Sequence, residues 1–397
     1  MNPKTLLLSL LFVVNLAFAQ TKSINFETST FADIKVKAKK ENKLIFIDAF
    51  TSWCGPCKWM AKNVFTNDTV ADYFNGKFIN AQFDMEKGEG LDIAKLYQVQ
   101  CYPNLLFIDG DGKLIHRGAG ASDMKSFIQL AEKAFNPEKR FSKYSDTYAT
   151  KKSDPAFLLD YIDAISKTCL KFDDVLKDYF ITQKDEALAN RTNWNIIRDY
   201  TTDYKSREFV YFLKNAEVYK KAYSADSVND KIMNVFVSGG YSIIYKKEMQ
   251  EIDFKAYKEE ISKMNFPALN EVLFKLDLAY SEKKGDWKNY ISIVVEKGDN
   301  YLHSATDFNN FSWAIYEHSG DKAAFLKAES WMQKALKESK EWYYYDTYAA
   351  ILYKLNKKQA AKAAATKAIE IAKTDGVAED EYKSTLELLQ KIEKLKG

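Results

Sequence analysis

Two patterns of hydrophobic and polar residues meet near residue 137. Before it, short apolar runs alternate with segments whose apolar residues recur at helical spacing, and after it only the helical spacing continues. Strands alternating with helices and ending in a hairpin predict an α/β layer structure with a mixed sheet. The expected strands are KLIFIDAF, KFINAQFD, NLLFID and KLIHR, and the expected helices are CKWMAKNVF, TVADYF, LDIAKLYQV and SDMKSFIQLAEKAF, with Asn67–Asp68 capping the second helix and Ser122 the last.

Residues 138–397 are predicted to be almost wholly helical. Near their end, AESWMQKAL and AKAAATKAI place alanines at matching positions, Ala328 with Ala361 and Ala335 with Ala368, an offset of 33 residues (368 − 335). Because this is close to the roughly 34-residue tetratricopeptide period, we expect repeats of that kind over 301–397. Generic helical hairpins with small residues at their contacts are the alternative. The region 138–300 shows no repeat and is expected to be all-α.

The first residues, MNPKTLLLSLLFVVNLAFAQ, have the order of a secretory signal. A lysine precedes a short apolar run, and Ala17-Phe18-Ala19 is a small-x-small cleavage pattern, so the mature chain is expected to start at Gln20. The run is shorter than the roughly 20 residues that a membrane-spanning helix needs. We therefore expect a cleaved signal peptide over 1–19, and an exported, periplasmic or secreted protein with no transmembrane span in its mature form.

Charge and composition narrow the possible partners. The chain has 58 basic and 55 acidic residues, a formal net charge of +3, and no long run of like charges, so no nucleic-acid partner is expected. Aromatic residues make up 15% of the 397 residues, while there are only 15 glycines and 6 prolines, which favours a well-packed, helix-rich protein.

Cys54 and Cys57 stand three residues apart in TSWCGPCKWM. Zinc would need four ligands, and the other two cysteines and the three histidines are scattered, so neither a metal nor a cofactor is predicted. A structural disulfide here would close too small a loop to stabilise the fold much. A redox dithiol explains more, because a cysteine before the first turn of a helix gains a stabilised thiolate, and Pro56 has no N–H to lose in that turn.

Residues 53–58, Trp-Cys-Gly-Pro-Cys-Lys, resemble the active-site signature of the thioredoxin family. Asp48, six residues before Cys54, is similar to the family's buried acid, Tyr102-Pro103 to its cis-proline, and Gly118 or Gly120 to its late glycine. The resemblance covers about residues 27–136. It implies a thioredoxin-like domain over 20–137, similar to the secreted thiol:disulfide interchange branch of the family.

The resemblance also implies roles for these residues. Cys54 would attack a substrate disulfide, Cys57 would resolve the mixed disulfide, and Asp48 would relay the proton of Cys57. The substrate-binding surface would consist of Trp53, Gly55, Pro56, Tyr102 and Pro103, with Lys58 adding positive charge near the thiolate.

Three positions depart from the family or stand outside its pattern. Gln82 is found where the family has a buried lysine, so we expect proton handling to differ. Cys101 is expected to be a buried thiol, with a third redox partner as the alternative. Cys169 is expected to be a lone, buried helix cysteine, with pairing to Cys101 as the alternative.

The favoured function is an exported thiol:disulfide oxidoreductase that reduces protein disulfides, with electrons from a membrane thiol donor, as the resemblance implies. A disulfide isomerase or oxidase is an alternative, in which the helical region is a substrate platform. A third hypothesis is a binding protein whose tetratricopeptide-like helices hold a peptide or protein partner. The intact signature argues against this third hypothesis, because a domain kept only as a tether has no need of a dithiol.

Overall fold

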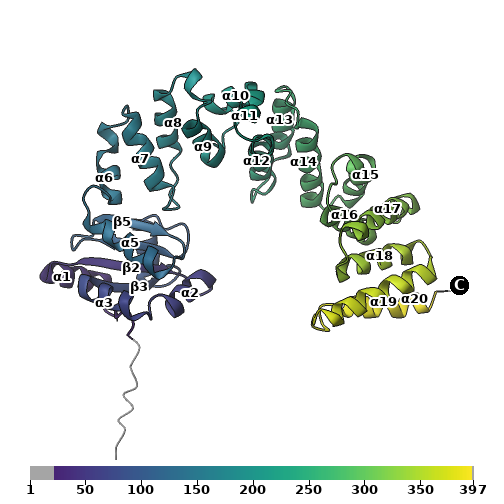
Figure 1. Ribbon diagram of the computed structural model, residues 1–397, viewed down its shortest axis with the longest axis horizontal. Helices are drawn as coiled ribbons and strands as arrows, with labels where there is room; N and C mark the ends of the chain where they lie inside the picture. Colours follow the sequence, from purple (N-terminus) through teal and green to yellow (C-terminus); the bar gives the residue numbers. More distant parts are fainter. Residues whose placement is uncertain (1–21, 396–397) are drawn as a thin grey trace, which may run out of the picture. The chain divides into compact units, whose positions relative to one another are not determined.

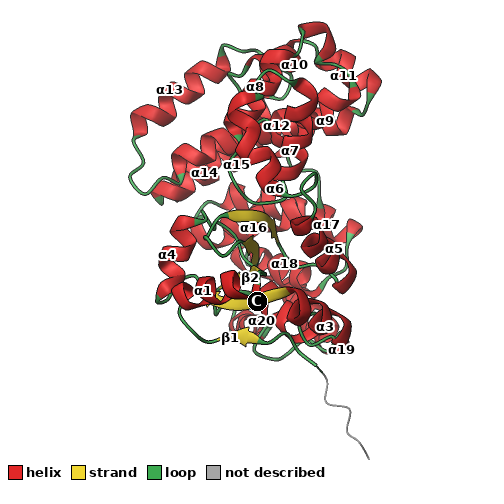
Figure 2. Ribbon diagram, turned by 90° about the vertical axis from the view of Figure 1, so that its left-hand side faces the viewer, coloured by secondary structure: helices red, strands yellow, loops and turns green. Residues whose placement is uncertain are grey.

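The computed structural model describes residues 22–395, so the predicted signal peptide and its cleavage site lie outside the described residues. The chain divides into two compact units, the first ending at Lys184 and the second beginning at Asp185 (Figure 1). Within the described residues, strands occur only in the first unit, and Figure 2 draws strands as yellow arrows and helices in red. An α/β domain followed by an all-α region is the predicted fold class, and it is confirmed.

The first unit contains every strand and helix predicted before residue 137. The short strand β1 and the helix α1 were not predicted from the sequence. The elements in chain order are β1 (Phe26–Glu27), α1 (Phe31–Glu41), β2 (Leu44–Phe50), α2 (Gly55–Asn63), α3 (Asp68–Lys77), β3 (Phe78–Asp84), α4 (Glu89–Leu96), β4 (Asn104–Ile108), β5 (Leu114–Ala119), α5 (Met124–Phe135), α6 (Phe141–Thr147), the 3-10 helix η1 (Tyr148–Thr150), α7 (Pro155–Ile165) and α8 (Asp173–Thr182).

The five strands form one mixed sheet in the order β1-β3-β2-β4-β5. The β1–β3 and β2–β3 pairs are parallel, whereas β2–β4 and β4–β5 are antiparallel. Side chains alternate between the faces of a strand, and the central strand β2 is buried on both. Ile45 and Ile47 pack with residues of α1 and α4, and Phe46 packs with residues of α2, α3 and α5. The core therefore lies in two layers, one on each side of the sheet.

Helix caps follow the local sequence. Asn67 caps α3 as predicted, its side chain accepting hydrogen bonds from the backbone amides of Thr69 and Val70. The prediction that Ser122 caps α5 is wrong. Asp123 is the cap, and its carboxylate accepts a hydrogen bond of 2.9 Å from the amide of Ser126. Serine and aspartate are similarly favourable as N-cap residues. Residue preference alone therefore does not decide which of two neighbouring residues caps the helix.

Helix α6 packs onto the outer strand β5, and the loop after α7 is hydrogen-bonded to the end of that strand. The amide of Phe141 donates a 3.0 Å hydrogen bond to Nδ1 of His116, and the amide of Ala119 donates one of 3.1 Å to the carbonyl of Lys167. The compact unit thus extends past residue 137, where we ended the thioredoxin-like domain. The domain boundaries at 137 and 300 remain sequence predictions.

The second unit is helical throughout its described part. Its elements are η2 (Asp185–Ala187), α9 (Arg191–Tyr200), α10 (Arg207–Lys214), α11 (Ala216–Ala222), α12 (Ala225–Ile244), α13 (Glu251–Ser262), α14 (Leu269–Lys284), α15 (Trp287–Lys297), η3 (Gly298–Asn300), α16 (Ala305–His318), α17 (Lys322–Glu338), α18 (Trp342–Lys354), α19 (Lys358–Thr374) and α20 (Lys383–Glu393). Among all the described helices, none combines the length and the hydropathy needed to cross a membrane.

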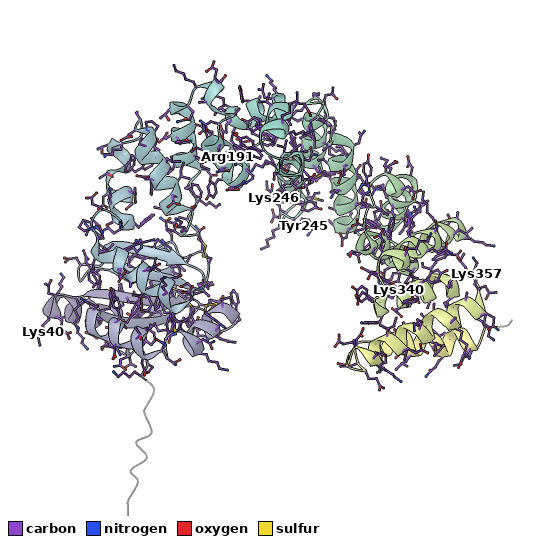
Figure 3. All side chains as sticks on the ribbon, in the orientation of Figure 1. Lys40, Arg191, Tyr245, Lys246, Lys340 and Lys357 are labelled. Atoms are coloured by element: carbon purple, nitrogen blue, oxygen red, sulfur yellow. A yellow bond between two sulfur atoms is a disulfide. The ribbon has the colours of Figure 1, made fainter. Side chains whose placement is uncertain are left out.

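The alanines of the predicted repeat lie in α17 and α19. All four are completely buried (Ala328, Ala335, Ala361 and Ala368). Small side chains at these positions let neighbouring helices approach closely. Lys357, at the start of α19, also forms a 2.7 Å ion pair with Glu329 of α17 (Figure 3). The helical hairpins are present, and their assignment to the tetratricopeptide class remains a prediction.

We expect Phe74→Ala to destabilise the first unit by about 3–5 kcal/mol, because it removes a fully buried ring and leaves a cavity. Phe74 stacks on Phe127 with ring centroids 4.3 Å apart and meets Phe46 edge-on at 4.9 Å. The measurement is pulsed hydrogen exchange of the β2 and β4 amides after equilibration in urea, which reports this unit alone. Leu96→Ala, at a side chain that is 64% exposed, is the control and should shift the urea midpoint little. Equal shifts for the two variants would contradict the described core.

Candidate active site

Cys54 and Cys57 form a disulfide at the start of α2, with their Cα atoms 5.3 Å apart. Strand β2 ends at Phe50, and a short turn brings the chain to Cys54, which is the N-cap residue of α2. The Sγ atom of Cys54 accepts a 3.1 Å hydrogen bond from the amide of Cys57. One sulfur of the pair therefore faces the positive, amide-rich end of a helix.

The two cysteines lie below an exposed rim. Cys54 and Cys57 are only 3% and 4% exposed, whereas Trp53 is 64% exposed. Gly55, Pro56 and Lys58 are exposed as well. The rim consists of residues that the sequence assigned to substrate binding or to support of the thiolate, so the structure brings these predicted residues together around the disulfide.

Trp53 and Tyr102 come from different segments and meet at the site. Their rings are arranged edge to face, with centroids 5.9 Å apart. The indole Nε1 of Trp53 donates a 3.0 Å hydrogen bond to Oε2 of Glu86, which fixes the orientation of the exposed ring. Glu86 was not predicted as a site residue, because nothing in the sequence links an acid in the loop after a strand to a tryptophan 33 residues earlier.

The Tyr102–Pro103 peptide bond is cis, as predicted. Pro103 is buried, and its carbonyl accepts a 2.9 Å hydrogen bond from the amide of Gly120, whose φ is +85°. Gly118 has a different constraint, because a Cβ there would lie 2.7 Å from a methyl group of Leu130. Within residues 22–395, the amide and carbonyl of Tyr102 make no backbone hydrogen bond. Tyr102 therefore has main-chain groups that an extended peptide could pair with.

Asp48 is the buried acid of the site. It is 1% exposed and lies on the same face of β2 as Phe46, the face covered by α2, and α2 buries Cys57. Its Oδ2 accepts a 2.8 Å hydrogen bond from Nε2 of Gln82, while Oδ1 has no partner among the described residues. Burial raises the pKa of Asp48 to about 6, against the opposing effect of the Gln82 hydrogen bond. Because residue 82 is a glutamine and not a lysine, the hydrogen-bond donor to this carboxyl is a neutral amide.

Cys101 and Cys169 form a second disulfide, with Cα atoms 6.3 Å apart. The expectations of a buried thiol at Cys101 and of a lone, buried helix cysteine at Cys169 are wrong, and the alternative pairing is correct. Cys169 is exposed and lies in the loop between α7 and α8, while Cys101 is half-buried. The pairing depends on α6 packing on β5 and on the loop after α7 returning to the end of β5, long-range contacts that spacing in the sequence does not reveal.

Comparisons with known proteins match the first unit of the chain. A family model described as a thioredoxin-like domain matches residues 31–135. Thioredoxin 1 of Chlorobaculum tepidum is 36% identical over 90 residues, which are 23% of this chain and 83% of that protein. The mitochondrial Thioredoxin-3 of Saccharomyces cerevisiae is 30% identical over 117 residues, 28% of this chain and 87% of that one. A solved structure described as a candidate disulphide-isomerase of Bacteroides thetaiotaomicron is 43% identical and covers 30% of this chain and 98% of its own, with a TM-score of 0.28.

The chain belongs to the thioredoxin family through its first unit. That unit has the thioredoxin-like disulfide oxidoreductase fold and carries the Cys-x-x-Cys pair at Cys54 and Cys57.

We expect Asp48→Asn to stabilise the first unit by about 3 kcal/mol at pH 7.5, with the gain disappearing near pH 4. The folded-state pKa of about 6 lies above the unfolded value of 3.8, so the native state binds this proton more tightly. The contribution of Asp48 is therefore complete below about pH 4 and is lost as the pH rises through about 6. The measurement is the urea midpoint of β2 amide protection in both proteins from pH 4 to pH 8. A difference that does not change with pH would show that the carboxyl ionises normally.

Proposed function

We propose that this protein is an exported thiol:disulfide oxidoreductase that reduces disulfides in other proteins. The observation that carries the proposal is the Cys54–Cys57 pair at the N-terminus of α2, buried at the centre of an exposed rim. The order of the N-terminal sequence supports export. The Gly-Pro pair between the cysteines, which resembles that of reducing thioredoxins, supports the direction of transfer.

The reaction begins with the dithiol form. The thiolate of Cys54, stabilised by the amides of the first turn of α2, attacks one sulfur of a substrate disulfide. The substrate S–S bond breaks, its second sulfur leaves as a thiolate, and a mixed disulfide with Cys54 forms. Cys57 then attacks the sulfur of Cys54 and releases the first substrate sulfur. Two electrons pass to the substrate, and the Cys54–Cys57 disulfide seen in the structure is the product.

Asp48 supplies a base for the second step. Cys57 must lose its proton before it can attack, and Asp48 lies below α2 with one carboxylate oxygen that has no partner among the described residues. Its raised pKa of about 6 is closer to neutral pH than that of an exposed aspartate, which suits a group that takes up and returns a proton. Gln82 holds the other oxygen and orients the carboxyl.

The rim offers a binding surface for an extended polypeptide. Trp53 presents a broad exposed face held by Glu86, and the main-chain groups of Tyr102 are available for strand-like pairing. Protein disulfides are therefore the proposed substrates. Each cycle consumes two electrons, so a reductant must restore the dithiol. The proposed donor is a membrane-bound thiol protein, as the resemblance to the secreted branch of the family implies.

We expect Cys57→Ser to accumulate a mixed disulfide with a disulfide-bonded substrate protein, because Cys54 can still attack but nothing resolves the product. Cys54→Ser should form no such adduct, since the remaining site thiol, Cys57, lacks the hydrogen bond at the helix end that stabilises the Cys54 thiolate. The measurement is intact mass after acid quenching and thiol alkylation, with peptide mapping of the bond. Cys54→Ser/Cys57→Ser is the control for exchange at the other disulfide. Adducts at Cys57 in the Cys54→Ser variant would reverse the assigned roles.

The reduction potential of the Cys54–Cys57 couple tests whether the protein reduces or oxidises its substrates. We expect a value near that of thioredoxin, roughly −270 mV. Equilibration of the full chain with thiol–disulfide buffers, followed by alkylation and peptide mapping of Cys54 and Cys57, measures it. A value of about −180 to −120 mV would instead support a disulfide isomerase or oxidase.

A further inference from the structure

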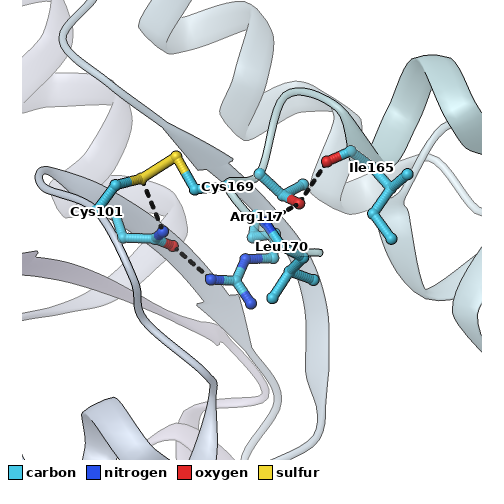
Figure 4. The surroundings of a disulfide bond; sticks show 7 residues. Cys101, Arg117, Ile165, Cys169 and Leu170 are labelled. Carbon is cyan, nitrogen blue, oxygen red and sulfur yellow. Dashed lines mark hydrogen bonds between the residues drawn. A yellow bond between two sulfur atoms is a disulfide. The ribbon is translucent and has the colours of Figure 1, made fainter. Parts of the chain in front are cut away.

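The disulfide between Cys101 and Cys169 has no part in the proposed reaction, and it joins two distant segments. Cys101 lies in the loop before β4, two residues from Pro103, and Cys169 lies in the loop between α7 and α8, 68 residues later (Figure 4). The amide of Ala119, the last residue of β5, donates a hydrogen bond to the carbonyl of Lys167, which lies two residues before Cys169 in the loop between α7 and α8. The loop that carries Tyr102 is thus covalently tied to the loop between α7 and α8.

The two sulfur atoms have different surroundings. Cys169 is exposed, so a thiolate from solution can approach it. Cys101 is half-buried, and its Sγ lies 3.9 Å from Nδ2 of Asn104, which donates a long hydrogen bond to it. Thiol–disulfide exchange depends on access to the attacked sulfur and on the stability of the leaving thiolate. Access favours attack at Cys169, with Cys101 as the leaving group.

A buried cation lies behind Cys101. Arg117 is only 3% exposed, and its Nη1 donates to the carbonyl of Tyr97 at 2.7 Å, while its Nη2 donates to Oδ1 of Asn104 at 3.0 Å. Within the part of the chain that the structure describes, Arg117 has no ion pair and its Nε has no partner. Burial lowers the pKa of the guanidinium to about 10, so it is still charged at neutral pH. A buried charge without a counter-ion is unfavourable, and a thiolate at Cys101 would supply one.

Asn104 connects the cation to the sulfur. Its side chain is fully buried, with the oxygen accepting from Arg117 and the nitrogen donating toward Cys101. Hydrogen bonds in series polarise one another, so the guanidinium strengthens the amide as a donor to sulfur. The charge of Arg117 therefore acts on Cys101 without direct contact.

We propose that Cys101–Cys169 is a second redox-active disulfide, reduced by dithiols through attack on Cys169, with Arg117 and Asn104 as positioning residues that stabilise the Cys101 thiolate. This inference goes beyond the proposed function and does not depend on Cys54 or Cys57. Its reduction releases the loop carrying Tyr102 from the loop between α7 and α8.

A dithiol donor would reduce the Cys101–Cys169 disulfide in two steps. A donor thiolate attacks Sγ of Cys169, the Cys101–Cys169 bond breaks, and its electron pair stays on Cys101 as a thiolate. A mixed disulfide between the donor and Cys169 results. The donor's second thiol, after losing its proton, attacks the donor sulfur of that bond and releases the Cys169 thiolate, which takes up a proton. The donor becomes a disulfide and two electrons reside on Cys101 and Cys169.

The test uses the full chain with Cys54→Ser and Cys57→Ser, so that only the second disulfide exchanges. The protein is equilibrated with oxidised and reduced dithiothreitol, quenched with acid, alkylated and weighed, while circular dichroism monitors folding. We expect reversible gain of two alkylated thiols in the folded protein. Reduction that occurs only at urea concentrations that unfold the first unit would overturn the proposal.

The attacked sulfur is identified with glutathione. Brief exposure of the same protein, followed by acid quenching, alkylation and peptide mapping, should place glutathione on Cys169 and the alkyl group on Cys101. Glutathione mainly on Cys101 would contradict the assignment of the leaving group.

Arg117→Met tests the role of the cation. Loss of a nearby positive charge raises a thiol pKa by about one unit or more, so we expect the equilibrium constant for reduction to fall about tenfold. Arg117→Lys should restore much of it, and Arg140→Met, at a partly buried arginine elsewhere in the unit, should leave it unchanged. Asn104→Asp covers the case in which Arg117→Met does not fold, because its carboxylate would neutralise Arg117 and lower the constant similarly. Variants of Arg117 or Asn104 that match the parent would overturn the role of the cation.

Discussion

The burial of β2 between two layers of helices is the constraint on which the redox site depends. Its flanking strands satisfy the backbone on both edges, and its alternate side chains fill both cores. Asp48 shares a face with Phe46 and is therefore forced into an apolar layer. The same strand ends just before Cys54, so one rigid element fixes both the acid and the start of the helix that carries the cysteines.

The first unit buries two ionisable groups of opposite sign, and each is hydrogen-bonded to the side-chain amide of a neutral residue. Asp48 contacts the amide of Gln82, and Arg117 contacts the amide of Asn104. Neither has an oppositely charged partner among the described residues, and burial shifts the pKa of each toward its neutral form. A neutral amide satisfies hydrogen bonds but does not cancel charge. Both groups therefore stay responsive to charge that appears on a sulfur nearby.

Local sequence was sufficient to locate the cysteine pair and most of the sheet, because a six-residue signature and apolar runs report short-range constraints. Helix α1 was missed although Phe31, Ile34 and Ala38 follow helical spacing, since charged residues separate them and hide the apolar face. Cys169 was misplaced for a different reason. Its partner lies 68 residues earlier, and the contacts of α6 and of the loop after α7 with β5 bring the sulfurs together. The hydrogen bonds of Glu86 and Arg117 likewise join residues far apart in the chain.

The second disulfide also affects where the chain can be divided. A fragment that stops at the end of α5 keeps the whole segment matched by the thioredoxin-like family model, yet it separates Cys101 from Cys169. Such a fragment carries an unpaired sulfur in the loop next to Tyr102, where it can couple to a second molecule or to a bound substrate. The shortest fragment that keeps both disulfides therefore extends beyond the matched thioredoxin-like domain and includes α6, α7 and Cys169.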